Sequence, residues 1–124
     1  MAYTYTPGTS IHVTIHLQPF QMDSFFTAFE TFYHNIIREE ECLSFQMYRN
    51  LEKPETIVWV EEWSKSPEWL VNNIITKDYY QEYLDVTEPM LLFGREANFF
   101  ERPPMEYSFS RAEFENYRGW VCAN

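Results

Sequence analysis

Apolar and polar residues alternate along two stretches of the chain, which is the pattern of a β-strand with one buried face. These stretches are Ile11–Gln18, which Pro19 ends, and the shorter Leu43–Tyr48. A third run, Thr56–Trp63, is too rich in β-branched and aromatic residues for a helix interior and is predicted to be a strand. Because a turn-like segment at 50–54 separates the second run from the third, these two are predicted to form a β-hairpin.

A helical period follows the first strand. Asp23 is a good N-cap, and a helix is predicted from Ser24 to Arg38. Its apolar residues recur at helical spacing and form a wide, largely aromatic stripe. They are Phe25, Phe26, Phe29, Phe32, Tyr33, Ile36 and Ile37. We expect this stripe to pack against the apolar face of the sheet.

Two shorter helices are predicted after the third strand. The tripeptide at 66–68 supplies a serine N-cap, a proline at the first helical position and an acid that the helix dipole favours. Thr76 is predicted to cap the second of the two, in which Tyr79, Tyr83 and Val86 recur at i, i+4 and i+7. Pro89 limits how far this helix can run.

A last strand is predicted at Arg95–Glu101, before two prolines at 103–104. The order strand, helix, strand, strand, helix pair, strand predicts an α+β, ferredoxin-like βαββαβ fold with a split second helix. We expect a loose N-terminal arm at 1–10, one domain at 11–101 and a C-terminal extension at 102–124.

The extension is not composed like a disordered tail. Apolar and polar residues alternate at 105–109, as in an edge strand, and Ser110 with Glu113 forms a capping box before Phe114, Tyr117 and Trp120. A strand and a short helix with one apolar side are predicted. Two roles remain open, a cap on the core and a lid over a pocket, and deletion of 105–124 would distinguish a loss of stability from a loss of ligand binding.

Charge narrows the classes of partner. The chain of 124 residues has nine basic and nineteen acidic residues, a formal charge of −10, which disfavours nucleic acid and anionic membranes as partners. No apolar run approaches the roughly 20 residues of a membrane span, and the N-terminus does not resemble a secretion signal. We therefore expect a cytoplasmic protein in which Cys42 and Cys122 are reduced thiols.

Motifs for nucleotide, zinc and serine-hydrolase chemistry are absent from the sequence, so we expect neither a metal nor a cofactor. His12 and His16 lie on the polar face of the first strand, where interface hydrogen bonding is the main interpretation and metal ligation the alternative. His16 is also a catalytic candidate. The aromatic content of 19% indicates either a pocket lined with rings or a large interface.

Rings and amides predicted between helices and sheet are candidates for a pocket that takes a planar, oxygenated substrate. They are Phe29, Tyr33, Trp59, Asn72, Asn73, Tyr79 and Tyr83. Asn72 and Tyr79 are the catalytic candidates among them and the others are candidates for substrate binding. Each residue taken alone is also explained by packing.

Three stretches, 39–50 (EEECLSFQMYRN), 57–63 (IVWVEEW) and 66–73 (SPEWLVNN, followed by YYQEYL), resemble the antibiotic biosynthesis monooxygenase family. The resemblance spans residues 11–101 and includes a strand that ends in Glu-x-Trp. It implies that ferredoxin-like domains pair as a dimeric α+β barrel. Trp63 and Trp69, which lie in these stretches, are also candidates for substrate binding.

The sequence departs from the family pattern at several positions. Glu41 stands where members often have glycine, and Asn72 stands where a histidine is common. Haem-degrading members have an Asn on the first strand, where this chain has Val13, and a His on the last helix, whereas no histidine follows Asn35 here. Haem oxygenation is therefore disfavoured.

The resemblance implies cofactor-independent oxygenation of an aromatic or polyketide-like small molecule (a phenol, anthrone or quinol) in secondary metabolism. The substrate would be deprotonated, and its carbanion would react with O₂ in a pocket that excludes water. A cofactor-free cyclase, isomerase or decarboxylase and a non-catalytic dimeric binding protein are the alternatives. A homodimer is expected, with the polar faces of the two sheets packed together.

Overall fold

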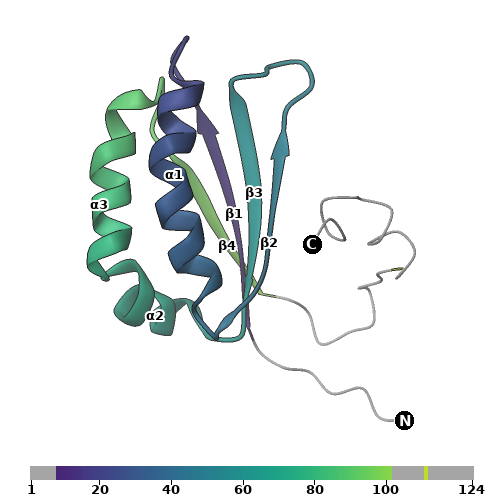
Figure 1. Ribbon diagram of the computed structural model, residues 1–124. Helices are drawn as coiled ribbons and strands as arrows, with labels where there is room; N and C mark the ends of the chain where they lie inside the picture. The colour runs from purple at the N-terminus through teal and green to yellow at the C-terminus, as the bar shows by residue number, and fades with distance from the viewer. Residues whose placement is uncertain (1–7, 102–110, 112–124) are drawn as a thin grey trace.

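An antiparallel sheet with helices on one face makes up the described part of the chain, residues 8–101 and 111, in the computed structural model (Figure 1). The strands are β1 (Thr9–His16), β2 (Cys42–Arg49), β3 (Thr56–Trp63) and β4 (Glu96–Glu101). The helices are α1 (Met22–Ile37), α2 (Pro67–Leu70) and α3 (Asp78–Thr87), with a π-helical turn η1 (Val71–Ile75) and a 3₁₀ turn η2 (Glu88–Met90). This order confirms the ferredoxin-like prediction. The strand and helix predicted for the extension at 102–124 lie outside the described residues.

The strand order in the sheet is β2-β3-β1-β4, and every neighbouring pair is antiparallel. The predicted hairpin of β2 and β3 is confirmed, with Met47 opposite Trp59. Trp59 in turn lies opposite Val13 of β1, which pairs on its other side with Ala97 of β4. Because side chains alternate along a strand, this register places the apolar positions of β1 and β3 on the face that the helices cover.

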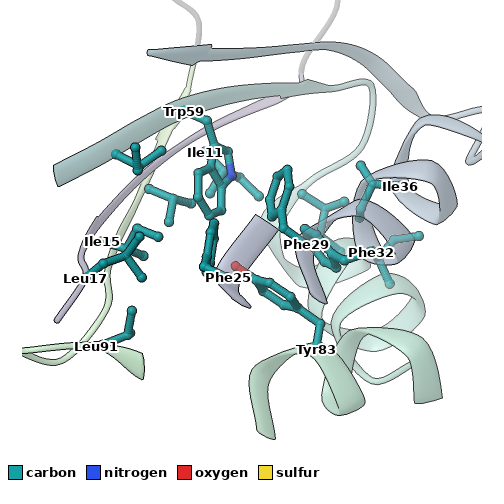
Figure 2. Close-up of a cluster of buried hydrophobic side chains, with 14 of the residues drawn as sticks. Ile11, Ile15, Leu17, Phe25, Phe29, Phe32, Ile36, Trp59, Tyr83 and Leu91 are labelled. Carbon is teal, nitrogen blue, oxygen red and sulfur yellow. The ribbon is translucent and has the colours of Figure 1, made fainter. Parts of the chain in front are cut away.

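The core lies between this face and the helices, and aromatic rings from α1 dominate it. In Figure 2, Phe25 and Phe29 of α1 point toward Trp59 of β3, and Tyr83 of α3 lies against Phe32. The rings of Phe32 and Tyr83 are stacked, with centroids 4.0 Å apart and an interplanar angle of 17°. The buried apolar residues are Ile11, Val13, Ile15, Leu17, Phe25, Phe29, Phe32, Ile36, Ile57, Trp59, Trp63, Leu70, Ile74, Tyr83 and Leu91.

The opposite face of the sheet has no helix over it within the described residues (Figure 1). Both of its histidines are hydrogen-bonded. His12 Nε2 lies 3.0 Å from the hydroxyl of Ser10, which also donates to Glu62 at 3.0 Å. His16 Nδ1 lies 2.9 Å from the hydroxyl of Thr56. We call this surface the outer face.

Strand β1 begins and ends two residues before the predicted limits. Thr9 already pairs with β3, and the strand ends at His16, opposite the first residue of β3. Leu17 continues the chain as an isolated bridge to Leu91, and its N–H donates to the carbonyl of Glu55 at 2.9 Å. The partner strand therefore sets the end of β1, and the alternation of side chains continues past it.

Helix starts follow the prediction at one of three positions. Ser66 caps α2 and accepts a hydrogen bond from the backbone N–H three residues on, at 3.2 Å. The N-cap of α1 is Gln21, and Asp23 lies in the first turn, where the helix dipole favours its charge. The prediction for Thr76 is wrong, because Lys77 is the N-cap of α3. The π-helical turn η1 keeps the backbone helical up to Thr76, which is its C-cap.

Candidate functional site

A groove with a volume of about 1140 Å³ lies between α1 and β2, with Ile57 of β3 contributing to its lining. We call it the α1–β2 groove. Its helix wall comes from residues at i, i+3, i+4 and i+7 along one side of α1. These are Met22, Asp23, Phe26, Thr27, Phe29, Glu30, Tyr33 and His34. The strand wall is the continuous segment 45–49 of β2.

Aromatic rings form a continuous surface inside the groove. Phe29 is stacked on Tyr33, with ring centroids 6.1 Å apart at 24°, and Tyr33 meets Phe45 edge to face at 5.3 Å. Trp59 lies behind them, stacked on Phe45 at 5.9 Å and tilted against Phe29 at 5.2 Å. Flat apolar surfaces of this kind bind planar aromatic ligands through offset or edge contacts.

Ionisable side chains of α1 and β2 accompany these rings. His34 Nε2 lies 3.8 Å from Glu30 Oε2, one helical turn earlier. Asp23 also lines the groove, and on the strand wall Arg49 Nε donates to the carbonyl of Pro54 at 2.8 Å. Imidazoles and carboxylates are among the side chains that most often transfer protons in enzymes. The groove thus combines a ring surface with an imidazole and carboxyl groups.

Glu61 is a carboxyl group in the core, with a side chain only 1% exposed. Trp59 Nε1 donates to its Oε2 at 2.8 Å, and Trp63 Nε1 donates to its Oε1 at 2.8 Å. Burial raises the pKa of Glu61, and the two indole donors act in the opposite direction without cancelling it. The carboxyl therefore holds two tryptophan rings in fixed orientations.

Two tyrosines of α3 that the sequence singles out lie on the other side of α1. The hydroxyl of Tyr79 donates to Glu39 at 2.9 Å, and Tyr83 accepts a hydrogen bond from Arg95 at 3.0 Å. Burial raises the pKa of Tyr79, as does its hydrogen bond to Glu39, and burial also raises the pKa of Tyr83 although Arg95 opposes it. Both phenols therefore stay protonated at neutral pH.

The structure does not bring the ten predicted site residues into one cavity. Two of them line the α1–β2 groove, and one lies directly behind it; these are Phe29, Tyr33 and Trp59. Three others lie elsewhere in or beside the core: Trp63, Tyr79 and Tyr83. The remaining four are away from the groove: Trp69, Asn72, Asn73 and His16.

Three of these four residues have a local side-chain contact. Asn73 Nδ2 donates to the backbone carbonyl of Trp69 at 2.9 Å, and Asn72 is exposed on η1. Lys65 Nζ lies 5.6 Å from the centroid of the Trp69 ring. His16 lies on the outer face, where it contacts Thr56. Among the described residues, the predicted amides therefore face solvent, and His16 lies on the opposite side of the sheet from the groove.

Several residues of the groove were not predicted from the sequence. Phe26, His34, Phe45 and Met47 belong to it, and Glu61 lies behind it. The sequence carried a signal for Glu61, because alternation places it on the buried face of its strand between two tryptophans. For the strand wall the signal was weaker, since β2 is an edge strand and its inward side chains remain partly exposed.

The sequence model of the antibiotic biosynthesis monooxygenase family matches residues 9–70, half of the chain. The chain belongs to this family. The matched segment runs from β1 to the end of α2 and contains both walls of the groove as well as Glu61. The resemblance proposed from the sequence is thereby confirmed.

Individual relatives agree with membership of the antibiotic biosynthesis monooxygenase family. A Pestalotiopsis microspora protein named "putative monooxygenase" is 26% identical over 104 residues, 84% of this chain and 87% of that protein. A conserved protein from Methanosarcina mazei has a TM-score of 0.70 at 21% identity, covering 77% of this chain and 92% of its own. Rv0793 from Mycobacterium tuberculosis has a TM-score of 0.69 at 14% identity, covering 82% and 99%. The two structures show the fold, and the family and the first relative support a monooxygenase-type role.

Two further features concern the whole described segment. Residues 8–101 and 111 contain no group of three or more His, Cys, Asp or Glu side chains placed to share a metal ion. Within the same residues, no helix has both the length and the apolar character needed to cross a membrane.

Proposed function

We propose that this member of the family is a cofactor-independent monooxygenase whose substrate is a planar aromatic or polyketide-like small molecule, such as a phenol, an anthrone or a quinol. The observation that carries the proposal is the α1–β2 groove, in which a ring surface and the His34–Glu30 pair line one space of about 1140 Å³. Small-molecule sites are typically apolar clefts of about 300–1,000 Å³ with a few polar groups. A fused-ring substrate fits this description.

Cofactor-independent oxygenation requires only a base and an apolar wall from the protein. His34 Nε2, beside Glu30, accepts the proton that a phenol or an anthrone methylene must lose. The resulting anion reduces O₂. In an anthrone the methylene becomes a carbonyl, one oxygen atom enters the product and the other leaves as water, so the substrate supplies every electron. Phe29, Tyr33 and Phe45 would give the anion an apolar wall to pack against.

Oxygen isotope incorporation tests the proposal. Purified protein is incubated with anthrone under ¹⁸O₂ while oxygen uptake is recorded. The molecular mass of the product is then measured by mass spectrometry. We expect one ¹⁸O atom per product molecule. Glu30→Gln and His34→Gln should lower kcat, the latter by about a hundredfold or more. Glu82→Gln, on the exposed surface of α3, is the matched control and should leave kcat unchanged.

Two other results would replace the oxygenase proposal. A product of altered structure that gains no oxygen would identify a cyclase, isomerase or decarboxylase. Saturable quenching of tryptophan fluorescence by the substrate, with no turnover, would identify a binding protein. If His34→Gln is as active as the unmodified chain, His34 is not the base, and the reaction takes place at another site.

We also propose that the chain forms a homodimer through the outer face. This face carries Val58 and Val60 of β3, Tyr48 of β2, which is 45% exposed, and Phe100 of β4, which is 50% exposed. Apolar side chains on a sheet face gain stability when a second sheet packs on them at about 10 Å. Sedimentation at micromolar concentration checks this, and a monomer there would contradict it.

A further inference from the structure

Glu61 is placed where a carboxyl group is least expected, on the helix-covered face of β3 between Trp59 and Trp63. Residues two apart on a strand point to the same face, so this Trp-x-Glu-x-Trp spacing brings both indole N–H groups to one carboxyl. Each donates to a different oxygen at 2.8 Å. Both oxygens of the carboxyl are therefore engaged by rings of its own strand.

An apolar residue would fill this position at a lower cost. Burying a carboxyl group is unfavourable unless its hydrogen bonds are satisfied, and within the described residues no cation is paired with Glu61. A carboxyl group accepts directional hydrogen bonds from the two indole N–H groups, which a hydrophobic side chain cannot do. Each indole ring is held at the angle at which its N–H points to the carboxyl oxygen.

One of the two rings supports the α1–β2 groove. Trp59 is stacked on Phe45, with an interplanar angle of 23°, and is tilted against Phe29. Those two rings line the groove, whereas Glu61 does not reach it. Trp59 also lies opposite Met47, another lining residue, across the β2–β3 pair. The orientation of the Trp59 indole therefore sets the positions of Phe29 on the helix wall and of Phe45 on the strand wall.

We propose that Glu61 is a positioning residue for the groove: by accepting the Trp59 indole N–H it holds the ring on which Phe29 and Phe45 pack, and so sets the affinity of the groove for a planar aromatic ligand. The inference rests on the proposed function, because it takes the groove as the ligand site. Glu61 itself touches no ligand and acts through Trp59.

Three variants separate positioning from stability. Glu61→Gln keeps the volume but places an amide N–H₂ against one indole donor. Trp59→Phe keeps a ring and removes its N–H. Ile74→Val, in the core on η1, is the control for general destabilisation. The probe is 1,8-dihydroxyanthraquinone, an oxidised and unreactive planar compound, and its Kd is measured by fluorescence quenching. We expect Kd to rise on the order of tenfold in the first two variants, as the loss of one buried hydrogen bond would give, and to stay unchanged in the third.

The indole N–H resonances report directly on the two hydrogen bonds to Glu61. The chain has four tryptophans, so four such NMR signals are expected. The probe should shift the Trp59 signal in the unmodified protein, and Glu61→Gln should displace the Trp59 and Trp63 signals before any probe is added. In turnover, Trp59→Phe should raise KM with little change in kcat.

The outcomes distinguish the two proposals. If the unmodified protein does not bind the probe, the groove is not the ligand site, and both proposals fall. If it binds the probe and Trp59→Phe binds equally well, the positioning role of Glu61 is wrong and the proposed function stands. Equal weakening in Trp59→Phe and Ile74→Val would also overturn it. Trp59→Phe decides the matter even if Glu61→Gln does not fold.

Discussion

Replacing Glu61 with glutamine should change how stability depends on pH. Burial raises the pKa of Glu61 in the folded state above its ordinary value of 4.5. Between pH 4.5 and the folded-state pKa, the folded chain binds more protons than the unfolded chain. The stability that Glu61 contributes therefore falls as pH rises through this interval. It is fully present below pH 4.5 and is lost as pH passes the folded-state pKa. Glutamine does not titrate, so the variant lacks this dependence.

The magnitude follows from the two hydrogen bonds. At the acidic end, the amide of Gln satisfies one indole donor and opposes the other, and one unsatisfied buried donor costs about 1–3 kcal/mol. As pH rises, the stability difference between the two proteins should shrink by up to about 1.4 kcal/mol per pH unit, until the folded-state pKa is passed. The advantage of glutamate is therefore largest in acid.

Urea unfolding, followed by tryptophan fluorescence at half-unit steps from pH 5.5 to 8.5, measures this difference. The range stays above the sequence isoelectric point of about 4.6, where a protein of low net charge precipitates. Subtracting the two curves cancels the titration of all other groups. A difference that is flat over this range would show that the folded-state pKa is not raised above its ordinary value, whether it is unchanged or lowered by the indole donors, and would refute the reasoning.

Three further predictions concern other parts of the molecule. Phe29→Ala should lower the free energy of unfolding by about 3–5 kcal/mol, whereas Phe26→Ala, at a ring 36% exposed, should cost clearly less; urea unfolding compares them, and equal losses would contradict the packing. Val60→Asp on the outer face should shift the chain to a monomer in sedimentation at an unchanged far-ultraviolet spectrum. Burial, followed by the Glu61 carboxylate, raises the pKa of the Cys42 thiol to about 11; in a Cys122→Ser background, its alkylation at pH 7.5 should be slower than that of a free thiol by about a hundredfold.

The fold was predictable because its signals are local. Strand alternation, the aromatic stripe of α1 and the Ser66 cap each depend on a few neighbouring residues, and each is found in the structure. The start of α3 was not, because η1 is a π-helical turn and the residues around Thr76 do not signal one. Errors of this kind move an element boundary without changing the fold.

The candidate site was less predictable because it depends on how elements pack. The amides Asn72 and Asn73 sit on a helical turn whose buried side is fixed by Leu70 and Ile74, so both face solvent. No local sequence pattern predicts that α1 packs so as to leave a groove beside β2. Glu61 is different, since an acid in phase with the buried positions of its strand breaks the pattern, and such breaks often mark residues with a role beyond packing.

Residues of the α1–β2 groove differ in how much stability their replacement costs. Phe29 belongs to both the groove and the core, so a substitution there alters ligand fit and folding together. Phe45 and Met47 lie on an edge strand and are partly exposed, so their replacement costs less stability. Under the proposed function, the range of ligands can therefore change through β2 at a lower cost in stability than through Phe29, and variant libraries aimed at new ligands should begin at β2.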